Sequence, residues 1–208
     1  MELLIIRHAL PVRRELTEGI ADPELAPEGL LQAEHLAKYL ASEKIDAVYA
    51  SPLRRAQQTA APLAALQKVG VTLIDDVAEW DRNSNEYVPV EELKATNDPR
   101  WQAMLRGEWN VPEESADDFN KRTIGAVDKL IDLHSGHRIA IVCHGGVINA
   151  YLTYILGLSN YQQGFFYPNY TSIHRVAAAR SGERSIVTIN ETSHLRGTGL
   201  PMGLFQKG

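Results

Sequence analysis

Three short apolar runs, each ending at polar residues, stand out in the hydrophobic pattern of this sequence. Residues 3–6 run into Arg7-His8 and residues 139–143 run into His144, both without a polar residue. Residues 45–50 run into Ser51 and are apolar except for Asp46. An unbroken apolar run of this length is typical of a strand that is buried on both faces of a parallel sheet. Parallel strands end at one edge of a sheet, where open α/β sheets bind ligands, so we expect these polar residues to lie close together.

Helical patterns separate the apolar runs. Pro27 opens a predicted helix whose apolar stripe is Leu30, Ala33, Leu36, Ala37 and Leu40. Ser51-Pro52 resembles an N-cap followed by proline at the first helical position, which predicts a second helix to about Gln67. Ser115 and Asp118 resemble a capping box ahead of a third helix. Its expected buried side is Phe119, Thr123, Ala126, Val127, Leu130 and Ile131, and residues 147–156 are typical of a fourth helix.

Three further strands complete the predicted sheet. They fall at residues 71–74, 172–176 and 185–189, and we expect the last two to form an antiparallel pair. Strands that alternate with helices indicate an α/β fold, here a three-layer α/β/α sandwich with a mostly parallel central sheet. We expect residues 1–208 to form a single domain.

The stretch from residue 77 to residue 112 departs from this alternation. It holds the tryptophans of the chain, Trp80, Trp101 and Trp109, together with several turn signals and no clear strand. Residues 90–94 and 100–106 are typical of short helices. We expect the stretch to be an insertion that covers one end of the sheet, where such segments often shape a ligand pocket.

The composition narrows the class of protein. A formal net charge of −5, with no basic run longer than two residues, argues against a nucleic-acid-binding surface. The single Cys143 excludes an intramolecular disulfide and fits a reducing compartment. Glu2 stands where a secretory signal would be basic, and no apolar span approaches the roughly 20 residues of a membrane helix. We therefore expect a cytoplasmic protein that binds neither nucleic acid nor membrane.

The polar residues at the strand ends suit a phosphate group. They would bring together two arginines, two histidines and two helix N-termini, and helix N-termini favour anions. Arginine matches phosphate oxygens with its planar fork, and its charge does not titrate away. Taken alone, however, Arg7-His8 is equally well explained as a strand end exposed to solvent.

Three motifs in order give the chain a family resemblance. Arg7-His8-Ala9 resembles an Arg-His-Gly nucleophile motif, and residues 51–60 resemble Ser-x-Leu-x-Arg-Ala-x-x-Thr-Ala, which assigns the phosphate arginine to Arg55 and not to Arg54. Residues 142–146, with His144-Gly145-Gly146, are similar to a second histidine motif. Together they resemble the histidine phosphatase superfamily, which includes phosphoglycerate mutases and acid phosphatases. The likeness covers most of the chain except about residues 80–112.

The resemblance implies a catalytic mechanism. One nitrogen of neutral His8 would attack phosphorus and form a phosphohistidine, while the other donates to a backbone carbonyl. Arg7, Arg55 and His144, with Gly145 at the helix start, would hold the phosphoryl oxygens. The resemblance implies no metal and no cofactor, because these cations offset the phosphate charge. Residues 77–112 would then form an insertion over the active site.

The resemblance also places a proton donor after the third strand. Glu79 occupies the matching position, and Trp80 beside it would help to desolvate the carboxyl group and raise its pKa. Asp81 is the competing candidate for this role, and a solvated loop carboxylate is the plain alternative for Glu79. Arg14 stands where many members carry an asparagine that touches the phosphate. Arg14, with Arg13, would contact the phosphate or a second anionic group, or the two arginines form only a solvated loop pair.

The predicted function is hydrolysis of a phosphomonoester, without a metal, through a phosphohistidine on His8. The partner is a small phosphorylated substrate, and a homodimer is one candidate assembly. One alternative is a cofactor-dependent phosphoglycerate-type mutase, which must protect its phosphoenzyme from water. Another is a phospho-ligand-binding protein without turnover. Cys143, next to His144, is expected to be a buried small side chain and not a nucleophile.

Overall fold

The strand β1 (Glu2–Arg7) lies inside a mixed sheet in this computed structural model, which describes residues 1–106, 108, 114–158 and 164–204. The other strands of the sheet are β3 (Ala47–Ala50), β4 (Val71–Leu73), β6 (Arg138–Cys143), β7 (Ile173–Ala178) and β8 (Arg184–Glu191). Their order is β4-β3-β6-β1-β7-β8. The pairs β1–β6, β6–β3 and β3–β4 are parallel, whereas β7 runs antiparallel to both β1 and β8. The predicted mostly parallel sheet and its antiparallel closing pair are confirmed.

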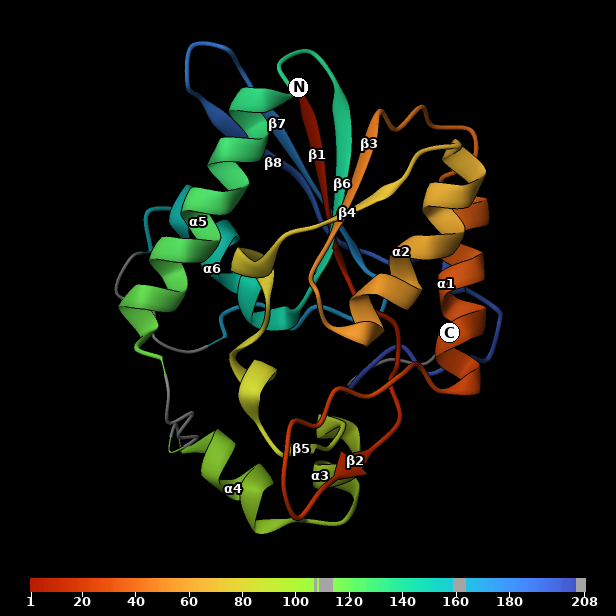
Figure 1. Cartoon of the computed structure of the whole chain (residues 1–208), viewed down its shortest axis with the longest axis vertical. Coiled ribbons are helices and arrows are strands. Elements are labelled where there is room, and N and C mark those ends of the chain that lie inside the picture. Colours follow the sequence, from red (N-terminus) through yellow and green to blue (C-terminus); the bar gives the residue numbers. More distant parts are fainter. Residues whose placement is uncertain (107, 109–113, 159–163, 205–208) are drawn as a thin grey trace.

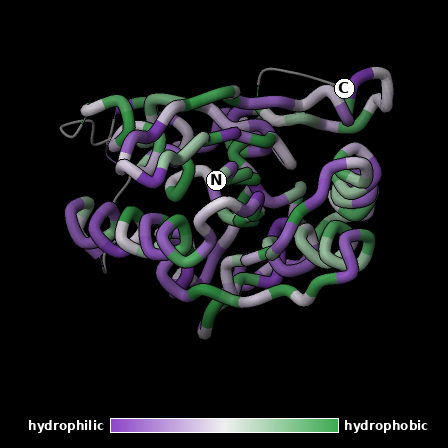
Figure 2. Tube along the Cα trace, turned by 90° about the horizontal axis from the view of Figure 1, so that it is seen from above, coloured by the Kyte–Doolittle hydropathy of each residue, from purple (hydrophilic) through white to green (hydrophobic). Residues whose placement is uncertain are grey.

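Helices cover both faces of the sheet. One face carries α1 (Pro27–Tyr39) and α2 (Arg54–Gln67), and the other carries α5 (Ala116–Leu133) and α6 (Gly145–Ile155) (Figure 1). Alternate residues of β1 divide between the two faces: Leu3 and Ile5 pack towards α5 and α6, whereas Leu4 and Ile6 pack towards α1 and α2. Hydrophilic residues alternate with hydrophobic ones along the helices (Figure 2), as burial of one helix face requires. The predicted three-layer arrangement is confirmed.

A smaller group of elements lies beyond the carboxyl ends of the parallel strands (Figure 1). It comprises β2 (Arg14–Glu15), η2 (Trp80–Asn83), β5 (Glu86–Tyr87), α3 (Val90–Ala95) and α4 (Pro99–Leu105). The turn η1 (Asp75–Val77) leads to it from β4 and packs against α5. The short helices predicted near residues 90–94 and 100–106 are confirmed. The expectation of no strand was wrong, because β5 pairs with β2 from the loop after β1. A two-residue strand is too short to show an alternating pattern. Trp109 lies outside the described residues.

Ser51 does not cap α2. The helix begins at Arg54, and its N-cap residue Leu53 makes no side-chain cap. The hydroxyl of Ser51 instead lies 2.7 Å from Nε2 of His144. The hydroxyl also accepts from the Leu53 amide at 3.3 Å, so it serves the turn before the helix as well as His144. The predicted N-cap was wrong, because the helix begins three residues later, at Arg54. Helix α6 also begins two residues earlier than predicted, at Gly145.

The buried face of α1 also differs from the predicted stripe. Leu30 is 48% exposed, while Gln32 is fully buried, accepting from the Leu10 amide and donating to the Pro201 carbonyl. The chain at Leu10 approaches so closely that a Cβ on Gly29 would overlap its carbonyl oxygen. The helix therefore turns Gly29 and Gln32 inward and leaves Leu30 at the surface.

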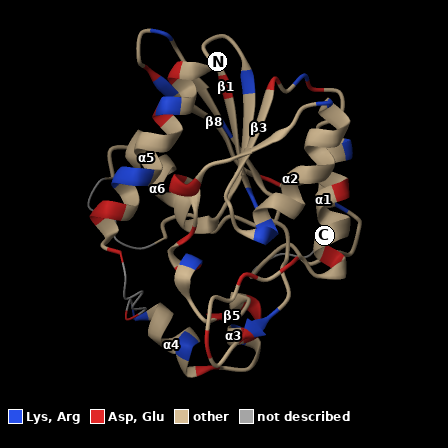
Figure 3. Cartoon of the chain, in the orientation of Figure 1, with Lys and Arg blue, Asp and Glu red and all other residues tan. Residues whose placement is uncertain are grey.

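The prediction for α5 is confirmed in detail. The Ser115 hydroxyl accepts from the Asp118 amide at 3.1 Å, which is the capping contact that the sequence indicates. All six residues of the predicted inner face are buried. No helix in the described ranges has the length and apolar character that a bilayer span needs. Basic and acidic residues are interspersed over the molecule, including the surface around β2 and α3 (Figure 3).

A charged cluster links β1, β7 and β8 to the loop after α1. Arg175 on β7 binds the carboxylates of Glu2, Glu43 and Glu191 at 3.1, 2.7 and 2.9 Å, and its side chain is 12% exposed. We expect Arg175→Met to lower the free energy of unfolding by about 3 kcal/mol, because it leaves three half-buried carboxylates without their shared cation. Urea denaturation at pH 7 measures this change.

The loss should depend on pH. Burial opposes ionisation of Glu2 and Glu191, but hydrogen bonds from Arg138 and Arg175 to Glu2, and from Arg175 to Glu191, outweigh it and lower the pKa of both. Their stabilisation is present above the unfolded-state pKa of about 4.3 and is lost as the pH falls through the lower folded-state values. The difference between wild type and variant should therefore shrink below about pH 4. An Arg13→Met control breaks only exposed ion pairs, with Glu15 and Glu92; an equal loss there would contradict the prediction.

Candidate active site

The ends of three parallel strands bring the predicted polar residues together. Beyond β1 the His8 amide donates to the Cys143 carbonyl at 2.9 Å, which ties it to the end of β6. The rings of His8 and His144 lie 5.1 Å apart between centroids. Ser51, at the end of β3, hydrogen-bonds His144 at 2.7 Å. These polar side chains, which the sequence places more than forty residues apart, therefore share one buried cluster.

His8 is held as a neutral imidazole of one tautomer. It is 3% exposed, and its Nδ1 lies 2.7 Å from the Ala9 carbonyl oxygen. A carbonyl only accepts, so Nδ1 carries the hydrogen and Nε2 carries the lone pair. Burial, followed by the positive charges of Arg55 and Arg7, holds the pKa of His8 well below its usual range. Nε2 is therefore available as a nucleophile near neutral pH.

Arg7 is fixed by aromatic rings that the sequence did not indicate. Its guanidinium carbon lies 4.3 Å from the ring centre of Tyr170 and 5.9 Å from that of Tyr167, and Nη1 donates to the Pro168 carbonyl at 2.6 Å. Both tyrosine hydroxyls donate to Glu91 on α3 at 2.9 Å. Stacking and hydrogen bonding together leave the guanidinium little freedom.

Arg55, near the start of α2, is almost fully buried. It is 1% exposed, its Nη2 donates to Asp81 at 2.7 Å, and its guanidinium carbon lies 4.7 Å from the ring centre of Tyr87. Burial raises the pKa of Tyr87 to about 12, so this neighbour stays uncharged. Arg54 points elsewhere and pairs with Glu24. The structure thus separates the two adjacent arginines as the family motif implied.

His144 closes the cluster from the start of α6. It is fully buried, and burial, followed by the charge of Arg55, holds its pKa well below the usual range. A facing phosphoryl dianion would shift the balance towards the protonated form. Gly145 begins α6, and a Cβ on it would meet open space. The neighbouring Cys143 is buried, which raises the pKa of its thiol and makes a thiolate nucleophile unfavourable.

Glu79 reaches the same helix terminus from the segment after β4. Its Oε2 accepts from the Gly146 amide at 2.8 Å and its Oε1 from the Trp80 amide at 3.1 Å. Burial, followed by the nearby charge of Asp81, raises the pKa of Glu79. A Cβ on Gly146 would overlap the Glu79 carboxylate, so this approach requires glycine. Burial thus shifts Glu79 towards its protonated form against the opposing effect of the two amide hydrogen bonds. Asp81 instead directs an oxygen to Arg55.

Arg13 and Arg14 lie outside the cluster around His8. The Arg14 guanidinium pairs with Glu24 at 2.7 Å, and Arg13 pairs with Glu15 and reaches Glu92 at 3.6 Å. The pairing of β2 with β5 sets Arg14 opposite Tyr87, whose ring contacts Arg55. Arg14 is therefore a neighbour of the cluster through Tyr87, not a member of it.

Three buried nitrogens in the cluster point to an anion as ligand. Arg7 Nε, Arg55 Nε and His144 Nδ1 are buried without a hydrogen-bond partner among the described residues. Buried polar groups are normally paired, so such atoms need an explanation, and a phosphoryl group would supply acceptors. In the same part of the chain, no set of three His, Cys, Asp or Glu side chains is arranged to hold a metal ion.

Comparison with known proteins also indicates a phosphate-binding site. A model of the histidine phosphatase superfamily (branch 1) matches residues 3–192. Phosphoserine phosphatase 1 of Hydrogenobacter thermophilus is 30% identical, covering 94% of both chains. Phosphoglycerate mutase-like protein 4 of Arabidopsis thaliana is 32% identical over 72% of this chain and 68% of its own. The structure of a phosphoserine phosphatase mutant from Entamoeba histolytica, in complex with phosphoserine, matches with a TM-score of 0.71 at 25% identity, covering 93% of this chain and 98% of that one.

The chain therefore belongs to the histidine phosphatase superfamily. Within that family it is a phosphomonoester hydrolase.

Proposed function

We propose that the protein hydrolyses a small phosphomonoester through a phosphohistidine on Nε2 of His8. The observation that carries this assignment is the tautomer of His8, fixed by Ala9 and flanked by two arginines and His144. Arg7, Arg55 and His144, with the amide end of α6 at Gly145, hold the phosphoryl oxygens. Their unpaired buried nitrogens support this role.

In the first step a bond forms between His8 Nε2 and phosphorus while the bond from phosphorus to the ester oxygen breaks. Glu79 gives its proton to the departing alkoxide, for which its raised pKa prepares it. In the second step water attacks phosphorus, its proton passes to the Glu79 carboxylate, and the electron pair of the N–P bond returns to His8. Inorganic phosphate then leaves and the starting protonation state is restored.

We propose phosphoserine as the first substrate to test, because two relatives named phosphoserine phosphatase cover more than nine-tenths of this chain. A second solved structure of phosphoserine phosphatase from Entamoeba histolytica, 26% identical to this chain, is in complex with 3-phosphoglyceric acid. Residues 77–112 are proposed to form an insertion over the active site. Its described part supports this by supplying Asp81, Tyr87 and Glu91, each of which contacts Arg55 or a tyrosine beside Arg7. Arg14 is proposed to meet the substrate beyond its phosphate.

One experiment separates the candidate functions. Purified protein is given phosphoserine and, separately, 3-phosphoglycerate, and free phosphate and phosphoryl transfer between glycerate positions are followed together. Release of phosphate to water without transfer supports the phosphatase. Transfer of the phosphoryl group between glycerate positions would establish the mutase alternative. If neither release nor transfer occurs with these two compounds or with a broad panel of phosphate esters, only a phospho-ligand-binding protein remains.

The Glu79→Gln variant tests the proton donor. An amide cannot protonate the leaving alkoxide, so kcat/KM for phosphoserine should fall by about 10²-fold or more. The value for p-nitrophenyl phosphate should change little, since nitrophenolate departs without a proton and kcat/KM reports only the steps up to that departure. The Asp81→Asn variant is the comparison. If Asp81→Asn, more than Glu79→Gln, lowers kcat/KM for phosphoserine while sparing that for p-nitrophenyl phosphate, the acid is Asp81.

A further inference from the structure

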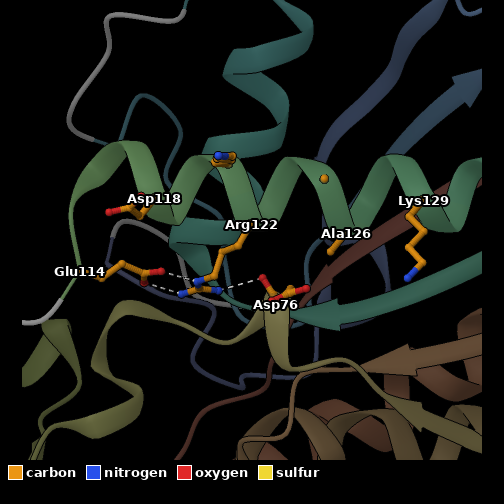
Figure 4. A pocket seen from close by; sticks show the side chains of 8 residues that line it. Asp76, Glu114, Asp118, Arg122, Ala126 and Lys129 are labelled. Atoms are coloured by element: carbon orange, nitrogen blue, oxygen red, sulfur yellow. Dashed lines mark hydrogen bonds and ion pairs between the residues drawn. The ribbon is translucent and has the colours of Figure 1, made fainter.

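Arg122 on α5 reaches across to the segment that carries Glu79. Its Nη1 donates to the backbone carbonyl of Asp76 at 2.8 Å (Figure 4). The same atom donates to the backbone carbonyl of Ala78, also at 2.8 Å. Ala78 directly precedes Glu79, so this contact fixes the peptide from which the carboxylate side chain departs. The side chain of Arg122 is 12% exposed, in a groove over α5 that Asp118 and Lys129 also line.

A carboxylate orients the Arg122 guanidinium. The Glu114 carboxylate accepts hydrogen bonds from Arg122 Nε at 2.6 Å and from Arg122 Nη2 at 2.8 Å. Both side chains of this bidentate pair are largely buried. Figure 4 shows Nε and Nη2 of Arg122 facing Glu114. This arrangement leaves Nη1 free to donate to the carbonyls of Asp76 and Ala78. A planar guanidinium makes all four contacts at once, which the three donors on one ammonium nitrogen do not reproduce.

An aromatic stack links the same guanidinium to the other side of Glu79. The Arg122 guanidinium carbon lies 4.6 Å from the ring centre of Phe119, one helical turn earlier. Phe119 in turn stacks on Trp80 with centroids 4.1 Å apart and planes inclined by 11°. The Trp80 amide donates to Glu79, and the Trp80 ring lies close to Gly146. Residues on both sides of Glu79 are therefore held by Arg122, directly through Ala78 and through Phe119 to Trp80.

We propose that Arg122, oriented by Glu114, is a positioning residue that sets the Glu79 carboxyl group for proton transfer to the leaving alkoxide. In this role Arg122 acts through the backbone and the aromatic stack around Glu79. Its charge also contributes to the lowered pKa of His144. The proposal rests on the proposed function, in which Glu79 is the acid. A purely structural role for Arg122 predicts losses that do not depend on the leaving group.

The Arg122→Met variant separates these roles. Methionine keeps an apolar stem against Phe119 and removes every donor. We expect kcat/KM for phosphoserine to fall about 10- to 100-fold, and that for p-nitrophenyl phosphate to fall less than about threefold, because only the alkoxide needs a well-placed proton. Combined with Glu79→Gln, the change should add little further loss, since the two act as one unit. An Arg138→Met control, at the opposite end of the sheet, should leave the ratio of the two rates unchanged.

The pH profile gives a second readout. Burial raises the pKa of Glu79, so a looser segment that admits water should lower it again. The alkaline limb of kcat/KM for phosphoserine should therefore move to lower pH in Arg122→Met. An unmoved limb together with equal losses on both esters would overturn the proposal.

Variants of different severity keep the test decisive. If Arg122→Met does not fold, Arg122→Lys is measured instead, because lysine keeps the charge and the apolar stem but not the planar fork. A smaller loss of kcat/KM that is again greater for phosphoserine than for p-nitrophenyl phosphate supports the proposal. Equal losses on the two esters in Arg122→Lys contradict the proposal. Failure of the proposed function is separate: wild type would release no phosphate, or His8→Ala would leave release unchanged, whatever Arg122 does.

Discussion

His8→Ala is expected to lower kcat on phosphomonoesters at least about 10⁴-fold, a loss of the size seen when a covalent nucleophile is removed. Alanine leaves Arg7, Arg55 and His144 able to bind the phosphate but provides no atom to attack it. Substrate binding should therefore persist, which calorimetry with phosphoserine measures beside the assay of phosphate release. A variant that keeps more than about one-hundredth of wild-type activity would contradict a covalent role for His8.

A matched control and a pH titration sharpen this result. His174 is likewise fully buried, on β7, and burial lowers its pKa to about 4, but it lies outside the cluster. His174→Ala should retain activity within about tenfold if it folds. Because the folded-state pKa of His8 is depressed, the unfolded chain binds more protons below about pH 6.5, and stability falls as the pH drops through that value. His8→Ala should lose less stability than wild type over that range.

Arg55→Met is expected to lower kcat/KM about 10³-fold, as removal of a cation that stabilises a transferring phosphoryl group does. It also leaves Asp81 facing the incoming phosphate without its cation, which adds repulsion to the lost attraction. The neighbouring Arg54→Met is the control, because Arg54 is half exposed and pairs with Glu24 at the surface. Steady-state kinetics on phosphoserine measure both. Equal, small losses in the two variants would show that the motif had assigned the wrong arginine.

Arg55→Lys refines that test. A lysine keeps the charge but not the planar fork that meets Asp81 and stacks on Tyr87. We expect it to recover only part of the lost activity. Full recovery would show that charge alone matters at this position.

The convergence of the site could be predicted because it follows from strand burial. The apolar runs before Arg7, Ser51 and His144 predict parallel strands. The carboxyl ends of parallel strands lie at one edge of a sheet, whatever segments connect the strands. The choice between Arg54 and Arg55 came from motif spacing, and the structure separates the two side chains accordingly. The tautomer of His8 was also predicted, since a neutral nucleophilic imidazole needs its other nitrogen held.

The contacts of the arginines with their partners were not predicted, because the partners come from loops and short segments without helix or strand periodicity. Tyr170 and Tyr167 approach Arg7 from the loop before β7, and Glu91 reaches both from α3. Tyr87 lies on a strand of two residues. No periodicity marks a stacking ring that belongs to a distant loop, so these contacts emerge only from the tertiary arrangement.

Ser51 and Gln32 show how tertiary contacts override local preference. A serine before a proline is an ordinary capping pattern, but the Ser51 hydroxyl pairs with His144. Gln32 is polar within a helix face, but it is buried because the Leu10 amide and the Pro201 carbonyl satisfy its side-chain amide. Both partners lie too far along the chain for a local pattern to reveal them.

The phosphoenzyme itself is the direct test of a phosphohistidine on His8. The Glu79→Gln variant, mixed rapidly with p-nitrophenyl phosphate and quenched in alkali, should accumulate it, because nitrophenolate leaves unaided while water is no longer activated. We predict a base-stable, acid-labile phosphate, mapped by mass spectrometry to the peptide that contains His8 and absent when His8 is alanine. Turnover without any such label, or a label on another residue, would contradict the mechanism.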